Sequence, residues 1–588
     1  MNVTVNMTES GPWPDPLDFS DPHRAGEAAA TEALLRAYVR ENAIPVPSEG
    51  EELTLDFPAS GVRLRVPVRH RSATGWHRFG EPRVGDDPAG AALVATAAVR
   101  ESVVRRRLPH HLGSDAVARV LDSARRTGTH LARRRAEPDG RRPEPFLEAE
   151  QALLLGHPFH PAPKSRQEAS DGEVGAYSPE LRGAFRLHWF AADPAVLAGE
   201  SADGRDPAGL LRELAEGVDA PEGTVPIPAH PWQAREVLAR PEVAALVEAG
   251  LLRPLGPSGP AWYPTSSLRT VYRPQAAMLK LSLGMKITNS RRNNLRSEMS
   301  LGVRAARLLA TGVGDWLRAE HPRFTILRDH AWVSAGASGA ETGLETAIRD
   351  NPFGGGPGDG RCVAGLLAER TGPGDGTPPR HRALLSAAVA RVCRIHRLSA
   401  ADACARWLER YLDVLAVPLI RLQARYGVAL EPHHQNTLVS LDGTGLPSAG
   451  WYRDSQGYYV AASRADELDR LLPGLSDGLE LVFDDDFVDE RVAYYLGVNN
   501  LLGLVGAFGA LGLADEVGLL RVLRAALERL RTAEPGAKGL LERLLDAPAL
   551  RCKGNFLTCV DGLDELVGDV HTQSVYFDFP NPLAEVQR

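Results

Sequence analysis

Polar and cationic side chains gather in residues 266–294, a stretch whose predicted strands are otherwise apolar. Ser267 and Arg269 are predicted on one strand, and because they are two residues apart their side chains should point to the same face. Lys280 is predicted on the next strand, and a helix predicted from about Asn293 should direct its positive N-terminal end toward these groups. The pattern predicts a site for an anion such as a carboxylate or a phosphate.

A structural alternative for this stretch is a charged sheet edge followed by a helix that Thr288 or Ser290 caps. Under that interpretation the polar run from Thr288 to Asn294 binds no ligand. The alternative is disfavoured because Arg269 and Lys280 are predicted in apolar strands, where an unpaired cation is costly to bury. We therefore expect this stretch to contribute to a binding site.

Two histidine-containing turns precede this stretch. Residues 156–166 read GHPFHPAPKSR, so His157, Lys164 and Arg166 share a proline-stiffened turn, which is either a preformed anion-binding edge or a solvated basic loop. His230 lies in a second Pro-rich turn just before Trp232. There we favour a structural role, with the indole as a packing anchor.

A third polar group follows in the C-terminal half. The run from Glu431 to Asn436 reads EPHHQN, and Asp454 lies on the next predicted strand. The carboxylates of Glu431 and Asp454 are ligands that Mg²⁺ accepts, and the amides could bind a purine or phosphates. The same residues could instead form a structural hydrogen-bond network, because a short motif of this kind has low specificity. The sequence leaves open which of His433 and His434 faces a ligand.

The elements that must position these groups follow from the hydrophobic spacing. The N-terminal third is predicted to be mainly helical, the middle mixes helices with the strands of a central sheet, and the C-terminal part mixes both. Gly- and Pro-rich runs at 354–360 and 371–379 predict a surface excursion or a linker between lobes. Helices are expected at 27–42, 92–107, 114–135, 401–426 and within 489–545, and strands at 185–190, 262–272, 278–288, 324–333, 428–441 and 449–460.

Composition argues against several classes of protein. A net charge of −8 and a pI of about 6.1 argue against nucleic-acid binding, which needs clustered cations. The 5 irregularly spaced cysteines indicate neither disulfides nor a zinc site and fit a reducing, cytoplasmic location. Residues 1–25 lack the pattern of a signal peptide and are expected to be a flexible tail. The apolar run 495–513 contains two asparagines and several glycines, so a buried helix is expected and not a membrane span.

Taken together and in this order, the segments HPFHPAPKSR, PAHPWQ, SSLRT, KITNSRRNN and EPHHQN with the later RD resemble the NRPS-independent siderophore synthetases, the IucA/IucC family. The resemblance covers roughly His157 to Asp454 and implies an α/β fold (mixed α+β) of three lobes around a central cleft. It implies a mainly helical thumb at 26–180, fingers at 181–380, and a palm with a helical tail at 381–588. Members of the family are commonly dimers, so a homodimer is expected.

The same resemblance implies a reaction and a set of roles. A carboxylate of citrate or a citrate derivative attacks the α-phosphorus of ATP in the presence of Mg²⁺, giving an acyl-adenylate and pyrophosphate, and an amine or hydroxyl then displaces AMP. The expected partners are a polycarboxylic acid and an amine, polyamine, amino acid or hydroxamate, with no nucleic acid and no membrane. The implied ATP-binding residues are His157, Ser267, Arg269, Lys280, Thr288, Gln435, Asn436 and Asp454. The implied carboxylate-binding residues are Thr288, Arg292 and His433, and the implied catalytic residues are Arg292, His433 and Lys280. The implied metal ligands are Glu431 and Asp454.

Other functions remain open from the sequence alone. A strand end with the pattern His-x-x-Asn followed by an aspartate also resembles small-molecule kinases, although no glycine-rich phosphate loop precedes it. A similarity of the tail to ferric-reductase-like proteins suggests a siderophore-binding or iron-reducing protein, although Cys552 and Cys559 alone cannot hold an iron–sulfur cluster. The sequence determines neither the amine, nor the siderophore, nor whether the acid is citrate, a mono-amidated citrate, a succinyl derivative or 2-oxoglutarate.

Overall fold

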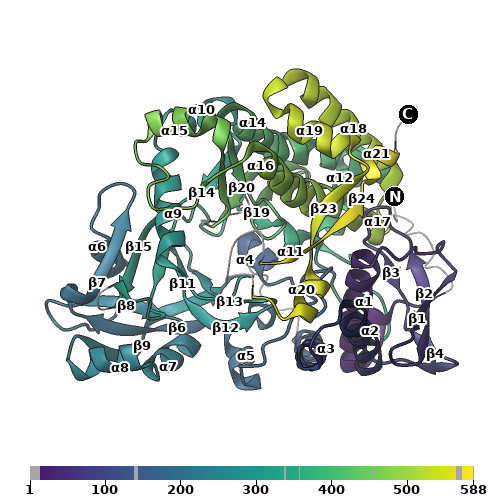
Figure 1. Ribbon diagram of the computed structural model, residues 1–588, viewed down its shortest axis with the longest axis horizontal. Coiled ribbons are helices and arrows are strands. Elements are labelled where there is room, and N and C mark those ends of the chain that lie inside the picture. Colours follow the sequence, from purple (N-terminus) through teal and green to yellow (C-terminus); the bar gives the residue numbers. More distant parts are fainter. Residues whose placement is uncertain are drawn as a thin grey trace.

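The computed structural model describes residues 13–137, 144–336, 339–356, 358–454, 456–564 and 573–586. Helices and sheets alternate along the chain, so the mixed α/β class expected from the sequence is confirmed. Figure 1 shows the N-terminal elements at one end, the main sheet at the other, and the C-terminal helices along the side that connects them.

The N-terminal region joins three helices to a small antiparallel sheet. Its elements are α1 (Pro22–Glu41), β1 (Glu52–Phe57), β2 (Val62–His70), β3 (Arg78–Phe79), β4 (Arg83–Val84), β5 (Asp87–Pro88), α2 (Ala91–Arg106) and α3 (His110–Ala136). The three predicted helices are confirmed, but the sheet was not expected. Its signal in the sequence is the alternation of Leu53, Leu55 and Phe57, which are buried while Thr54 and Asp56 between them are exposed.

Part of the expected tail is folded onto this region. Leu17 is buried in a short 3-10 helix (Pro16–Asp18), and the Asp15 carboxylate forms ion pairs with Arg69 at 3.0 Å and Arg78 at 3.3 Å. The expectation of a flexible tail is therefore wrong for residues 13–25, because distant arginines of β2 and β3 supply partners that no local pattern reveals. Residues 1–12 lie outside the described part of the chain.

The middle region is built on an eight-stranded antiparallel sheet. Its strands are β6 (Phe185–Ala192), β7 (Leu197–Ser201), β8 (Val225–Ala229), β9 (Leu252–Pro264), β10 (Thr270–Tyr272), β11 (Met278–Leu281), β15 (Asp329–Ala335) and β16 (Thr346–Arg349). They lie in the order β7-β15-β16-β11-β10-β9-β6-β8. The strands expected in this region are confirmed, with breaks that the sequence did not show.

These breaks affect two predicted site residues. Ser267 and Arg269 lie in the tight turn that joins β9 to β10, where Leu268 has a positive φ of 65°. The prediction that both residues share a strand and face one side is therefore wrong, because the chain reverses between them. A hairpin, β12 (Leu283–Ile287) and β13 (Ser290–Arg292), then leads to α9 (Arg296–Leu308), which begins three residues later than predicted.

The C-terminal region packs helices around the largest apolar core. Its longer helices are α12 (Leu384–His396), α13 (Ala400–Tyr411), α14 (Val417–Tyr426), α16 (Asp485–Val492), α17 (Gly503–Ala510), α18 (Glu516–Ala533) and α19 (Lys538–Asp546). Its strands are β14 (Phe324–Leu327), β17 (Arg361–Cys362), β18 (Val428–Leu430), β19 (Thr437–Leu441), β20 (Pro447–Arg453), β21 (Tyr458–Ala461) and β22 (Val482–Phe483). The strands form two small sheets, β14-β20-β19-β17 and β18-β21-β22. The helix expected at 401–426 is confirmed as α13 and α14, joined through a π-helical turn.

The end of the chain returns to the N-terminal helices. The hairpin β23 (Ala549–Gly554) and β24 (Val575–Pro580) leads α20 (Asn555–Asp561) back beside α1 and α3 (Figure 1). The buried carboxylate of Glu41 in α1 accepts hydrogen bonds from the backbone N–H groups of Phe556 at 2.9 Å and Leu557 at 2.8 Å. A segment within the predicted palm, 381–588, thus packs on the predicted thumb.

One long apolar helical stretch, Asp485–Ala510, meets the length and composition of a membrane span within the described residues. Its most apolar window is 94% buried inside the protein. Polar side chains within it have partners, since Asn500 accepts a hydrogen bond from the Tyr411 hydroxyl at 2.7 Å. The buried helix expected from the sequence is confirmed.

The second histidine turn has the structural role that we favoured. His230 precedes α7 (Pro231–Leu238), and its Nδ1 accepts a hydrogen bond from the backbone N–H of Trp232 at 3.1 Å. The ring is buried between Tyr177 and Phe185. Burial, helped by the nearby His188, lowers the pKa of His230 to about 3, so the imidazole is neutral at neutral pH.

Replacing His230 with Asn should reduce the loss of stability in mild acid. Because the pKa of His230 is about 3 in the folded state against 6.5 for a free side chain, the stability it contributes falls as the pH drops below 6.5, by about 2 kcal/mol at pH 5. Asn can still cap α7 but does not titrate. Urea unfolding at pH 7.5 and pH 5 should show a smaller decrease for the variant; an equal decrease would contradict this assignment.

Candidate active site

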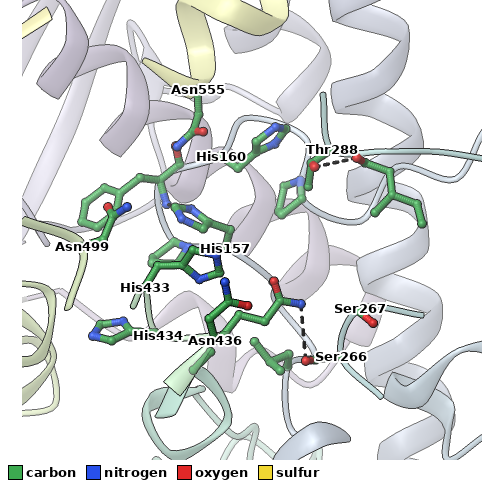
Figure 2. A pocket seen from close by; sticks show the side chains of 18 of the residues that line it. His157, His160, Ser266, Ser267, Thr288, His433, His434, Asn436, Asn499 and Asn555 are labelled. Carbon is green, nitrogen blue, oxygen red and sulfur yellow. Dashed lines mark hydrogen bonds between the residues drawn. The ribbon is translucent and has the colours of Figure 1, made fainter. Parts of the chain in front are cut away.

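A cavity of about 430 Å³ lies where the three regions of the chain meet. Figure 2 shows side chains from the 157–160 loop, the β9–β10 turn, the β12–β13 hairpin, the segment before β19 and the start of α20 around it. The sequence-predicted residues all line this cavity: His157, Ser267, Arg269, Lys280, Thr288, Arg292, Glu431, His433, Gln435, Asn436 and Asp454.

An ion pair between buried Lys280 and partly exposed Asp454 lies in the cavity lining. The Nζ of Lys280 in β11 donates a hydrogen bond to Oδ1 of Asp454 at 2.9 Å, and a guanidinium nitrogen of Arg349 lies 3.8 Å from the same oxygen. Burial alone would raise the pKa of Asp454, but the charges of Lys280 and then Arg349 outweigh it and hold that pKa well below its usual range. The carboxylate is therefore ionised and can accept bonds from a further cation.

Arg269 links the β9–β10 turn to the segment after the β12–β13 hairpin. Its Nη1 donates to the carbonyl of Arg292 at 3.0 Å and to Oδ1 of Asn294 at 2.9 Å. Burial and then the charge of Arg292 lower the pKa of Arg269 to about 10, so the group stays cationic at neutral pH. Ser267 accepts a hydrogen bond from the backbone N–H of Thr270 at 3.2 Å, which closes the turn.

The N-terminus of α9 does not contribute as expected. The backbone N–H of Arg296 donates to the Glu341 carboxylate at 2.8 Å, and that of Leu295 approaches Glu298 at 3.5 Å. These two N–H groups are therefore already matched to carboxylates of the protein itself. The prediction that this helix end directs its dipole at the ligand is wrong, since none of the residues 295–298 lines the cavity.

Thr288 and Arg292 form a second pair in the cavity lining. Thr288 occupies the turn of the β12–β13 hairpin with φ of 56°, so it does not cap a helix. Its Oγ1 accepts a hydrogen bond from Nη2 of Arg292 at 2.8 Å. Behind the turn, a guanidinium N–H of Arg119 in α3 donates to the carbonyl of Thr288 and, at 3.1 Å, to Oδ1 of Asn289. The hairpin tip is thus fixed by a helix of the N-terminal region.

The adjacent histidines at the EPHHQN segment face different partners. A ring nitrogen of His434 lies 2.8 Å from the carbonyl oxygen of Asn500, which holds this ring against the C-terminal helices. The ring of His433 lies beside His157 in the cavity (Figure 2). Burial is the main cause that lowers the pKa of His157 to about 3 and that of His433 to about 4, so both imidazoles are neutral at neutral pH.

The oxygen donors at the cavity fit a magnesium ion that is shared with a ligand. In the described part of the chain no group of three His, Cys, Asp or Glu side chains could hold a metal by itself. Mg²⁺ commonly needs only one or two carboxylates, because waters and phosphate oxygens complete its shell. Ionised Asp454 suits this role. Glu431 suits it less, since burial raises its pKa and its carboxylate accepts a hydrogen bond from the Tyr459 hydroxyl.

Several lining residues were not recognised as site residues from the sequence. Lys553 and Asn555, from the β23–α20 junction, line the cavity although they lie far along the chain from the nearest motif, which ends at Asp454, and no local pattern distinguishes them. Asn499 belongs to the apolar helix and was noted only as a break in its hydrophobicity. Lys164 and Arg166 were recognised as part of a basic turn without a role of their own, and both line the cavity.

The fold and the cavity define a large α/β protein that can hold anionic ligands between its N-terminal, middle and C-terminal regions. Comparison with known proteins agrees. A family model described as the IucA / IucC family matches residues 145–368, and one described as a ferric iron reductase FhuF-like transporter matches residues 405–568.

Similar proteins include the rhizobactin siderophore biosynthesis protein RhbC of Rhizobium meliloti, 36% identical over 91% of this chain and 93% of that protein. A spermidine-citrate ligase of Bacillus anthracis is 35% identical over 74% of this chain and 73% of its own. The ATP-bound aerobactin synthetase IucA of Klebsiella pneumoniae superposes with a TM-score of 0.81 at 29% identity, over 95% of this chain and 99% of that one. The chain therefore belongs to the IucA/IucC family, and it is a ligase of siderophore biosynthesis.

Replacing Gly156 with Ala should destabilise the loop that carries His157. Gly156 has φ of 81°, and an added Cβ would lie 2.7 Å from Cβ of Pro163 and 3.0 Å from Cε of Lys164. We expect the free energy of unfolding to fall by about 1–3 kcal/mol in addition to the effect of backbone strain. The matched control is Gly204→Ala, because Gly204 has φ of 75° but nothing within 4 Å of an added Cβ. Equal losses of unfolding free energy for both variants in urea would show that the contacts with Pro163 and Lys164 add no destabilisation.

Proposed function

We propose that this ligase uses ATP to adenylate a carboxylate of citrate or a citrate derivative and then transfers the acyl group to an amine or hydroxyl. The observation that carries the proposal is a single cavity that is lined by both the Lys280–Asp454 pair and the Thr288–Arg292 pair. The names of related proteins support this proposal. They include a spermidine-citrate ligase and an N(2)-citryl-N(6)-acetyl-N(6)-hydroxylysine synthase of Escherichia coli, and the latter is 31% identical to this chain over 74% of its length.

The ATP side of the cavity is assigned to cations, hydroxyls and amides. In this proposal Lys280 and Arg269 bind phosphate oxygens, and their charges offset the repulsion between the triphosphate and the incoming carboxylate. Holding both anions in one cavity also removes much of the entropic cost of their meeting. The complete set proposed for ATP is His157, Ser267, Arg269, Lys280, Thr288, Gln435, Asn436 and Asp454.

The acid side is assigned to Arg292, Thr288 and His433. The guanidinium of Arg292 binds a carboxylate of the acid through its planar fork, and the Thr288 hydroxyl that it already contacts completes the site. His433 is neutral in the folded protein, so it can accept a hydrogen bond from a hydroxyl or donate one to a carboxylate without adding charge. In this proposal a second carboxylate of the same acid reacts with the nucleotide.

The proposed reaction has two steps, an adenylation followed by an acyl transfer. A carboxylate oxygen of the acid forms a bond to the α-phosphorus while the bond from that phosphorus to the bridging oxygen of pyrophosphate breaks. The amine then attacks the acyl carbon, loses a proton, and AMP leaves with the electrons of the broken C–O bond. Arg292, Lys280 and His433 are the proposed catalytic residues. Lys280 contacts the phosphates on which negative charge develops, and Arg292 and His433 hold the acid in position for attack.

Magnesium belongs to the same proposal. Asp454 and, less directly, Glu431 would hold the ion together with phosphate oxygens, and the ion would neutralise charge at the phosphates. We also propose that the enzyme is a cytoplasmic homodimer that binds neither nucleic acid nor membrane. Light scattering of the purified protein, which would give twice the chain mass, tests the oligomeric part.

Pyrophosphate release tests the function. Purified protein with ATP and Mg²⁺ is screened across citrate, 2-oxoglutarate, succinate and related acids, with hydroxylamine as a surrogate nucleophile. Release that depends on one acid supports adenylation and identifies the acid. ADP in place of AMP would indicate a kinase, and no product with any acid would count against the proposal. An iron-reducing function is not proposed, because Cys552 and Cys559 in the FhuF-like segment are both buried free thiols.

Two alanine substitutions should separate the sides of the cavity. Arg292→Ala should abolish acid-dependent pyrophosphate release while ATP still binds, because the lost guanidinium is assigned to the carboxylate. Lys280→Ala should weaken ATP binding by about 1.5–3 kcal/mol and acid binding less, as expected for one charge-assisted contact. Calorimetric titration of each ligand measures both effects. Arg291→Ala is the control, because Arg291 is exposed and pairs with Glu168 away from the cavity lining. Equal weakening of both ligands by either variant would contradict the assignment.

A further inference from the structure

A group of buried charges in the lining of the same cavity has no role in the proposed function. Lys164, Arg166 and Glu180 all line the cavity, and each is between 2% and 4% exposed. Lys164 donates a hydrogen bond from Nζ to Oε1 of Glu180, so these two charges offset each other. Burial would raise the pKa of Glu180, but the charges of Lys164, His130 and Arg166 together outweigh it and lower that pKa to about 2, so the carboxylate is ionised.

Arg166 remains as a cation with no full partner. Its Nη1 donates to the carbonyl of Ser165 at 2.9 Å, and its Nη2 lies 3.6 Å from the Glu180 oxygen that Lys164 already binds. Its Nε has no hydrogen-bond partner although it is buried. A buried guanidinium N–H without an acceptor is unfavourable, and such groups commonly indicate a missing ligand or water. The one carboxylate that Arg166 approaches in the cavity lining is thus shared with Lys164, and Nε of Arg166 has no acceptor among the described residues.

One face of α3 fixes both Arg166 and the hairpin that carries Arg292. Oδ2 of Asp122 accepts a hydrogen bond from the backbone N–H of Arg166 at 2.7 Å. One turn earlier on the same helix, Arg119 holds the hairpin tip through Oδ1 of Asn289 at 3.1 Å. The charge of Arg292 is also among the causes that lower the pKa of Arg166, after burial. One helix face thus holds both the backbone of Arg166 and the hairpin that carries Arg292.

We propose that Arg166 is a second carboxylate-binding residue, which together with Arg292 binds the two carboxylates of a tricarboxylic acid that do not react with ATP. The proposal rests on the proposed function and specifies its acid. A guanidinium matches one carboxylate with two parallel hydrogen bonds, so two guanidinium groups select for two non-reacting carboxylates. Glu180, held by Lys164, orients Arg166 and leaves a net positive charge for the ligand. An acid with two carboxylates in total fills only one of these subsites.

A matched pair of ligands tests the subsite. Propane-1,2,3-tricarboxylate and glutarate share one carbon chain and differ only in the central carboxylate. In calorimetric titration with a non-hydrolysable ATP analogue present, the wild-type protein should bind the tricarboxylate roughly 10- to 100-fold more tightly, the range expected for one charge-assisted contact. Arg166→Gln should reduce this preference to threefold or less while ATP-analogue affinity stays unchanged.

Control variants and outcomes separate this role from a structural one. Arg291→Gln, a change of an exposed arginine on the same hairpin, should keep the wild-type preference. If Arg166→Gln does not fold, Arg166→Lys keeps the charge but loses the planar fork, and its preference should fall below that of the wild type. A wild-type protein without preference, or an Arg166 variant that keeps it, would overturn the proposal. If the wild-type protein prefers the tricarboxylate but shows no acid-dependent pyrophosphate release, the subsite is supported and the proposed adenylation is contradicted.

Discussion

The ion pair between Lys280 and Asp454 is the interaction on which the arrangement of the cavity depends. Lys280 belongs to the eight-stranded sheet and Asp454 follows β20 of the C-terminal sheet, so their 2.9 Å contact sets the two sheets relative to each other. The chain crosses between the same sheets where β14 is followed directly by β15. Loss of Asp454 would leave the buried Lys280 ammonium without this carboxylate, and such a loss commonly costs 3–5 kcal/mol. After loss of Lys280, the Asp454 carboxylate would still have Arg349 at 3.8 Å. One contact thus serves both the fold and the proposed phosphate site.

The electrostatics of the cavity suit ligands that bring negative charge. Lysines and arginines in its lining, among them Arg166, Arg269 and Arg292, outnumber the lining carboxylates. His157 and His433 are neutral because they are buried. Buried cations that lie close together destabilise the folded state. Anionic ligands that bind only the folded state would offset this destabilisation. The same excess charge that makes the empty cavity unfavourable therefore gives it affinity for an acid and a nucleotide.

Elements far from the motifs determine the shape of this site. α3 holds the basic turn and the hairpin tip from behind, and the β23–α20 segment brings Lys553 and Asn555 to the cavity after the chain has passed through the whole C-terminal core. Glu41 in α1 accepts the backbone N–H groups of α20 and so attaches this last segment to the first helix. The site is complete only when both ends of the chain are in place.

Sequence alone determined the chemical types of the site residues and most of the elements, because hydrophobic period and motif composition are local properties. Helices such as 401–426 and the mixed α/β class were predicted correctly, and all eleven candidate residues line one cavity. Tertiary structure decided what depends on distant partners. The reversal between Ser267 and Arg269, the carboxylates that occupy the N-terminus of α9, the folding of Asp15 onto Arg69 and the approach of Lys553 to the cavity all join groups that local spacing cannot relate.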